Sequence, residues 1–118
     1  MSVDPTGADL KRFLEQDPGG PVVMLNLLRF RPGGREWYLE YGTALGDTAA
    51  QVLYVGEGGH SLEGEEWDMV ALVRYPSRQK FLEMISSEDF AEHHPLRSAA
   101  LADSRLIPCA EATATSLA

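Results

Sequence analysis

The chain of 118 residues carries 44% hydrophobic and 24% charged side chains, which predicts one globular domain and excludes an intrinsically disordered chain. Its net charge of -8, with only ten lysines and arginines scattered along it, argues against nucleic acid or an anionic membrane as a partner. A single cysteine, Cys109, excludes an intrachain disulfide, so a reducing compartment is expected.

The first 20 residues predict a helical extension rather than a targeting segment. Thr6 precedes Leu10, Phe13 and Leu14 at helical spacing, and the glycines and prolines at 18–21 end the helix. A secretory signal would begin with basic residues and continue with an apolar run, and no segment reaches membrane-spanning length. We therefore expect a cytoplasmic protein.

A buried strand and a helix are expected next. Val22 to Phe30 is a nearly continuous apolar run between glycine- and proline-rich segments, which is typical of a strand buried on both faces. A helix is predicted from Glu36 to Gln51, because apolar residues recur there on one helical face. Gly42 and Gly46 lie one turn apart in this helix and suggest the close approach of another backbone.

A hairpin is predicted in the middle of the chain. Its strands are Val52–Val55 and Trp67–Tyr75, and an acidic turn at residues 63–66 lies between them. Glu63 to Glu66 match neither a calcium loop nor a paired-carboxylate site, so we interpret them as a solvated turn.

The last third predicts a helical region and a closing strand. Ser77 is the expected N-cap of a second main helix, and Ser87 and His94-Pro95 each suggest a further short helical start. Arg105–Cys109 is expected as a strand at a sheet edge, because Pro108 cannot donate to a ladder.

This order of elements indicates an α+β, ferredoxin-like βαββαβ fold with a four-stranded antiparallel sheet and an extra N-terminal helix. We expect a helical extension at residues 1–20, the domain at 21–110 and a flexible tail at 111–118.

The two central strands suggest how the sheet is used. Val23, Leu25 and Leu27, with Val70 and Leu72, would form an aliphatic face packed against the helices. The opposite face is also apolar, and we expect it to remain uncovered and to pair with a second copy, enclosing a cavity. Its expected residues are Met24, Asn26, Leu28, Phe30, Trp67, Met69, Ala71, Val73 and Tyr75.

Several short motifs in order resemble the domain-of-unknown-function family 1330 of the dimeric α/β-barrel superfamily. The motifs are residues 21–28 (PVVMLNLL), Tyr38 and Tyr41, Glu63-Gly64, residues 75–78 (YPSR), Phe81, Arg97 and residues 100–106 (ALADSRL). The resemblance implies a ferredoxin-like homodimer and supplies no established reaction. Relatives in the superfamily include cofactor-independent monooxygenases, lactone isomerases and haem proteins.

Asn26 is the sharpest candidate for a functional residue. An amide in the middle of an apolar strand costs about 1–3 kcal/mol if its hydrogen-bonding groups find no partner. In a cavity it would orient a carbonyl or phenol, and the alternative is a structural bond to a tyrosine or the backbone. Tyr41 and His94 are the other candidate catalytic residues, although His94 can equally serve as a helix cap.

The expected ligand-binding residues are Met24, Leu28, Trp67, Met69 and Arg97. Tyr38, Tyr41, Trp67 and Tyr75 would form an aromatic wall, or alternatively core. Arg29, Arg74 and Arg97 would bind a carboxylate or, more often for scattered arginines, form surface ion pairs, and Arg97 is the first of the three to test. No spacing of His93, His94 or His60 predicts a metal site, and we expect no cofactor.

Two functions are consistent with these residues. The first is a homodimer that binds an unidentified small molecule, including a cofactor-independent enzyme of the monooxygenase or isomerase kind acting on an aromatic or carbonyl compound. The alternative is a noncatalytic dimerisation or sensor module, in which an apolar sheet face serves assembly alone.

Overall fold

The computed structural model describes residues 4–44 and 50–110. In chain order its elements are α1 (Gly7–Glu15), β1 (Val22–Phe30), α2 (Gly34–Ala44), β2 (Gln51–Glu57), β3 (Met69–Tyr75), α3 (Arg78–Ile85), α4 (Glu88–Ala100) and β4 (Leu101–Cys109). The predicted tail at 111–118 lies outside the described residues. No helix in the described ranges is long and apolar enough to cross a membrane.

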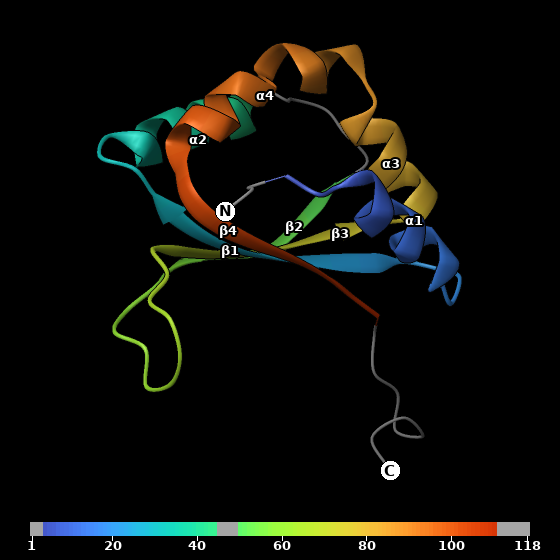
Figure 1. The fold of residues 1–118 in the computed structure, drawn as a ribbon, viewed down its shortest axis with the longest axis horizontal. Coiled ribbons are helices and arrows are strands. Elements are labelled where there is room, and N and C mark those ends of the chain that lie inside the picture. Colours follow the sequence, from blue (N-terminus) through green and yellow to red (C-terminus); the bar gives the residue numbers. More distant parts are fainter. Residues whose placement is uncertain (1–3, 45–49, 111–118) are drawn as a thin grey trace.

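The strands form one antiparallel sheet in the order β2-β3-β1-β4. The ferredoxin-like α+β fold predicted from the order of elements is therefore confirmed. β1 lies at the centre, pairing with β3 from Val22 to Leu28 and with β4 from Val23 to Phe30. The helices all lie on one side of the sheet, and the loop between β2 and β3 hangs on the other side (Figure 1).

Local sequence signals set the starts of the helices. Thr6 caps α1 in a reciprocal capping box with Asp9, and the serine side chains at 77 and 87 accept from the backbone of α3 and α4. The predicted further start at His94-Pro95 was wrong, because Pro95 lies inside α4. The one hydrogen bond that proline removes is offset by the packing of α4 along α2.

Several predicted boundaries also differ from the structure; for example, β3 begins at Met69 rather than at Trp67. Gln51 begins β2, so the predicted helix does not extend that far; its ladder partner is Arg74 of β3. β4 begins at Leu101 rather than Arg105, since β1 is long enough to pair with it as far as Phe30. The close approach predicted at Gly46 lies outside the described residues.

The assignment of the two sheet faces from sequence was wrong. The inner face, which the helices cover, carries Val22, Met24, Leu28, Met69 and Tyr75, and each of these is buried. The outer face carries the aliphatic series of β1 and β3, which is half-buried and has no helix over it (Figure 1). Both series of side chains are apolar, so alternation alone could not identify the face under the helices.

The inner face and the helices enclose two core clusters. The larger is Phe13, Val22, Met24, Tyr75 and Phe81, with edge-to-face ring contacts of Phe81 to Phe13 at 5.5 Å and to Tyr75 at 5.1 Å. Buried Arg78 donates from Nη1 to the Phe13 carbonyl oxygen at 2.7 Å and so fixes α1 on α3. The smaller cluster is Leu28, Met69 and Leu101.

One glycine permits a close backbone contact between helices, and it is not one of the predicted pair. A Cβ on Gly34, at the start of α2, would meet the carbonyl oxygen of Ala100 and lie 2.9 Å from its carbonyl carbon. A Cβ on Gly42 would meet nothing within 4 Å. The suggested close approach at Gly42 was therefore wrong.

Trp67 fixes the β2–β3 loop on the outer side of the sheet. Arg29 and Arg105 stack on its ring at 4.7 and 5.1 Å. Arg29 also donates to the Glu66 carbonyl oxygen at 2.7 Å, and Arg105 pairs with Glu65 at 3.2 Å. The acidic turn is thus held by arginines from β1 and β4.

Candidate functional site

A cavity of about 710 Å³ lies between the inner face of the sheet and helices α2, α3 and α4. Its walls are mostly apolar, with methionines from β1, β3 and α3, and with Phe81, Ile85 and Phe90 from the helices. This volume is typical of a small-molecule site. The cavity lies within one protomer, so the prediction that a dimer interface encloses it was wrong.

Three tyrosines and one amide supply polar groups to the apolar walls. Tyr38 and Tyr41 come from α2, Tyr75 from β3 and Asn26 from β1. Within the described ranges, no hydrogen bond is found for the three phenol hydroxyls, and Arg78 Nε is the one side-chain nitrogen or oxygen there that is fully buried without a hydrogen-bond partner. The tyrosine hydroxyls therefore retain accessible surface and can bond a ligand.

Asn26 lies at the middle of the cavity floor, between Ala71 of β3 and Leu106 of β4 in the sheet register. Its Nδ2 donates to the Met24 carbonyl oxygen at 3.2 Å, which satisfies one of its hydrogen-bonding groups locally. In the described part of the chain its amide oxygen has no partner. Asn26 thus combines a structural bond with a free acceptor facing the cavity.

Burial controls the ionisation of these phenols. It raises the pKa of both Tyr38 and Tyr41, while the positive charge of Arg97 acts in the opposite direction on both. Burial likewise raises the pKa of Tyr75 to about 12, with a smaller contribution from Tyr38. All three are neutral hydroxyls at physiological pH and can donate hydrogen bonds.

The Tyr75 shift predicts a loss of stability at high pH. The folded pKa lies above the value of about 10 expected for an unfolded tyrosine, so this contribution is fully present below pH 10 and is lost as pH rises towards 12. The free energy of unfolding should fall between pH 9 and pH 11 in both proteins. We expect this fall to be about 1 kcal/mol smaller in Tyr75→Phe than in the wild type, because the variant lacks the phenol. Urea unfolding at both pH values measures the difference; equal losses would contradict the assignment.

A histidine and an arginine lie at the polar end of the cavity. His94 and Arg97 project from successive turns of α4, and Arg97 is only 8% exposed. His94 Nε2 lies 2.7 Å from Asp4 Oδ1, and Arg97 Nη1 lies 3.7 Å from the same oxygen. The ring of Phe90 packs on that of His94 at 5.2 Å. The site therefore brings a carboxylate onto a histidine and an arginine.

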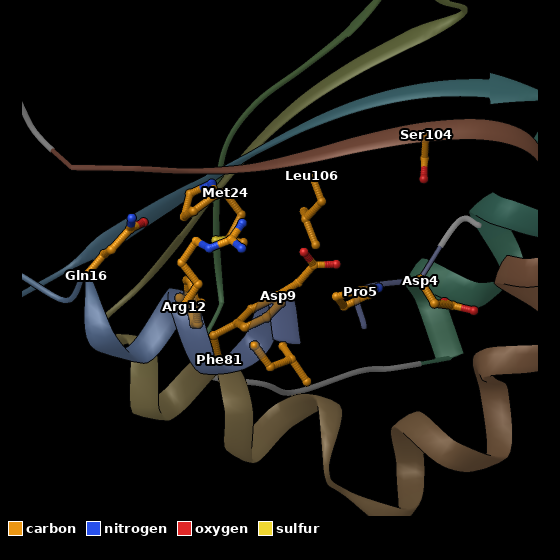
Figure 2. Close-up of a pocket in the computed structure, with 12 residues that line it drawn as sticks. Asp4, Pro5, Asp9, Arg12, Gln16, Met24, Phe81, Ser104 and Leu106 are labelled. Carbon is orange, nitrogen blue, oxygen red and sulfur yellow. The ribbon is translucent and has the colours of Figure 1, made fainter. Parts of the chain in front are cut away.

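A second cavity of about 360 Å³ lies between α1 and β4. Asp9 and Arg12 point into it from the helix, and Ser104 and Leu106 point into it from the strand (Figure 2). The residues that line both cavities are Asp4, Pro5, Leu10, Met24, Phe81 and Leu106. The segment before α1 thus lies where the two cavities meet.

Most of the predicted site residues lie around the larger cavity. They are Asn26, Tyr41 and His94 among the candidate catalytic residues, and Met24, Met69 and Arg97 among the expected ligand-binding residues. Leu28 is fully buried in the smaller core cluster, and Trp67 packs on the outer side, so neither lines the cavity. Asp4 was missed: an exposed acidic residue ahead of α1 carries no local signal of a contact 90 residues away.

The remaining candidates lie elsewhere. His93 Nδ1 contacts the Asp89 carbonyl oxygen at 2.9 Å, and His60 pairs with Glu66 at 2.7 Å on the exposed loop. Cys109 is a free thiol beside Ile107 at the end of β4. Among the residues that the structure describes, no group of three or more histidine, cysteine or acidic side chains is placed to hold a metal ion.

Comparison with solved structures identifies a family for this chain. The RPA0582 protein of Rhodopseudomonas palustris, described as a protein of unknown function, has 34% sequence identity and a TM-score of 0.85, over 94% of this chain and 97% of that one. The crystal structure of methylated RPA0582 protein gives 35% identity and a TM-score of 0.87, over 96% of both chains. The chain belongs to the RPA0582 family. No protein-family model and no curated protein sequence matches it.

More distant structures share the fold of the RPA0582 family. A DABB family protein with a ferredoxin-like fold from Mesorhizobium loti has a TM-score of 0.66 at 6% identity, over 80% of this chain and 100% of that one. A dimeric ferredoxin-like protein of unknown function from Thermobifida fusca has a TM-score of 0.60 at 15% identity, over 80% and 93%. SnoaB, a cofactor-independent oxygenase from Streptomyces nogalater, has a TM-score of 0.53 at 11% identity, over 81% and 98%.

Proposed function

We propose that the chain binds a small, mostly apolar organic molecule with a carbonyl or phenol oxygen in the larger cavity. The observation that carries this proposal is the set of tyrosine hydroxyls and the Asn26 amide oxygen that face an apolar cavity of about 710 Å³ without partners in the described part of the chain. Apolar walls bury the carbon skeleton, and a few polar groups fix its orientation. A close-packed protein core leaves few voids larger than a water molecule, so packing alone does not account for a cavity of this size.

The same groups support a cofactor-independent enzyme acting on an aromatic or carbonyl compound. A neutral phenol such as Tyr41 can donate to a substrate oxygen and stabilise the negative charge that develops when a neighbouring C–H proton is removed. His94, which lines the same cavity, is the candidate proton acceptor. The description of SnoaB as a cofactor-independent oxygenase agrees with this reaction class, through the shared fold alone.

Two experiments test the binding. Mass spectrometry would identify compounds that co-purify with the protein, and thermal-shift measurements would screen a panel of aromatic ketones and phenols. Tyr41→Phe is expected to weaken binding of a positive compound by about fivefold to tenfold, because one hydrogen bond to the ligand is lost. Tyr54→Phe is the matched control, since Tyr54 is 54% exposed on β2 and does not line the cavity. Equal affinity in both variants would contradict a role for the Tyr41 hydroxyl.

Asn26→Leu separates this proposal from a noncatalytic module. The replacement has a similar volume and gives up one bond to the Met24 carbonyl oxygen, so the fold is expected to persist. If the cavity binds a ligand, the substitution abolishes the thermal shift. A noncatalytic module would show no ligand effect in the wild type and no change in the variant.

We also propose that the chain forms a homodimer through the outer face of the sheet. Val23, Leu25, Leu27, Val70 and Leu72 are aliphatic, and Tyr54 and Ile107 are at least 43% exposed there. Burying such a surface favours association at about 25 cal/mol per Å². The distant relative from Thermobifida fusca is described as dimeric, and the motif resemblance to family 1330 supports the same assembly.

Light scattering during gel filtration tests the assembly. We expect a dimer for the wild type at micromolar concentration and a monomer for Leu25→Glu, because a buried unpaired carboxylate is costly at an interface. Lys11→Glu, on exposed α1, is the control for added negative charge and should remain dimeric. A monomeric wild type would exclude the proposed assembly without affecting the cavity within the protomer.

A further inference from the structure

The polar end of the larger cavity already holds a carboxylate, and the chain itself supplies it. One oxygen of Asp4, Oδ1, lies 2.7 Å from His94 Nε2 and 3.7 Å from Arg97 Nη1. A carboxylate can only accept hydrogen bonds, so His94 donates to it from Nε2. The histidine and the arginine thus converge on one anionic oxygen at the edge of an apolar space.

The burial of these groups is unequal. The Arg97 side chain is 10% exposed, whereas that of Asp4 is 42% exposed. A buried guanidinium requires an anionic or hydrogen-bonding partner, so Arg97 is the residue that defines an anion-binding position at this end of the cavity. Asp4 reaches it from an exposed segment ahead of α1 and lies at the edge rather than inside.

The rest of the cavity wall suits the apolar part of a ligand whose anionic group binds at Arg97. Among the described lining residues, Arg97 is the sole arginine or lysine, and Asp4 is the sole acidic residue. Apart from these two residues and from His94 and Asn26, the wall consists mainly of aliphatic, methionine, aromatic and tyrosine side chains. A molecule with one anionic end and an apolar remainder would therefore satisfy both parts.

We propose that Arg97 and His94 form the carboxylate subsite of the larger cavity, that its ligand is a monocarboxylic acid with an apolar or aromatic body, and that Asp4 occupies this subsite until the ligand displaces it. This inference rests on the proposed binding function and adds its substrate class. A single guanidinium and a single imidazole match one carboxylate, and the net charge of -8 disfavours multiply charged anions.

The position of Asp4 makes the displacement structurally simple. Asp4 and Pro5 are exposed and precede the capping box at Thr6, which holds the start of α1 independently of them. They also line both cavities, so an outward movement of this segment would bring the two spaces together. The core contact of α1 through Phe13 and Arg78 would remain in place.

The test compares the anionic probe naphthoate with naphthyl methanol, a neutral probe that has the same aromatic body, by calorimetric or fluorescence titration. The wild type is expected to prefer naphthoate. Asp4→Asn should raise its affinity for naphthoate by about threefold to tenfold and leave naphthyl methanol unchanged, because the competing charge is removed. Glu15→Gln on exposed α1 alters the net charge equally and should change neither affinity.

Arg97→Gln should weaken naphthoate binding by about tenfold to a hundredfold, with little effect on naphthyl methanol, since a charge-assisted hydrogen bond is lost. If this variant does not fold, the Asp4→Asn comparison decides alone. An Asp4→Asn variant with unchanged or weaker naphthoate binding overturns the inference. If both probes bind with equal affinity, the carboxylate subsite is excluded but the proposed small-molecule binding stands. If neither probe binds to any variant, the result counts against both the subsite and the proposed binding function.

Discussion

Gly34→Ala is expected to lower the free energy of unfolding by about 3 kcal/mol or more. The added methyl group would meet the Ala100 carbonyl oxygen and lie 2.9 Å from its carbonyl carbon and 3.1 Å from its Cα. These are backbone atoms at the junction of α4 and β4, so they cannot rotate away as a side chain would. Relief would require α2 to move away from α4, against which it packs.

Gly42→Ala in the same helix is the control. Its methyl group would meet nothing within 4 Å, and alanine favours a helix over glycine by about 0.5–1 kcal/mol. This variant should therefore be neutral or slightly more stable in urea or thermal unfolding. Similar losses in both variants would show that helix propensity, rather than the contact with Ala100, governs the response.

Leu28→Ala is expected to cost about 2–5 kcal/mol, the second large effect. Leu28 is fully buried against Met69 and Leu101, with Phe30 and Tyr38 packed around them. Removing its side chain loses the burial of an entire leucine and leaves a cavity that rigid strand neighbours cannot fill. Denaturant unfolding at constant m-value measures the loss.

Leu62→Ala is the matched control for the same chemical change. Leu62 is 97% exposed on the β2–β3 loop, so its substitution should alter stability by less than about 0.5 kcal/mol. A Leu28→Ala variant of unchanged stability but reduced ligand binding would restore the original prediction that Leu28 contacts ligand. The structure favours the stability effect.

Signals confined to a few neighbouring residues made much of the fold predictable. The apolar run of β1 matches the observed strand from Val22 to Phe30, and Thr6, Ser77 and Ser87 each cap the helix that they were expected to begin. These features depend on local hydrogen bonds and on burial, which the sequence records directly. The antiparallel sheet order follows once the elements are placed in sequence.

The packing of the sheet was less predictable. Met24 and Leu25 are neighbours of similar polarity, yet one lies under the helices and the other on the outer face. Which face a helix covers depends on contacts such as those of Phe81 with Phe13 and with Tyr75, which join distant segments. Long-range packing of this kind has no periodic signature in a chain with two apolar faces.

The candidate site was predictable where one residue departed from its surroundings. Asn26 interrupts an apolar strand, and that contrast identified it. Asp4 has acidic and polar neighbours in sequence, so its contact with His94 becomes visible only in three dimensions. Trp67 was misplaced for the related reason that an aromatic residue beside a strand packs as well on two arginines as in a cavity.

The alternation of β1 between the two sheet faces makes this strand sensitive to a change in length. Inserting or deleting one residue ahead of Met24 would turn each following side chain to the opposite side. Leucines would then line the chamber where the amide now lies, and Asn26 would be placed on the surface proposed for pairing. A single-codon insertion there should therefore eliminate ligand capture and self-association together, whereas point substitutions can separate them.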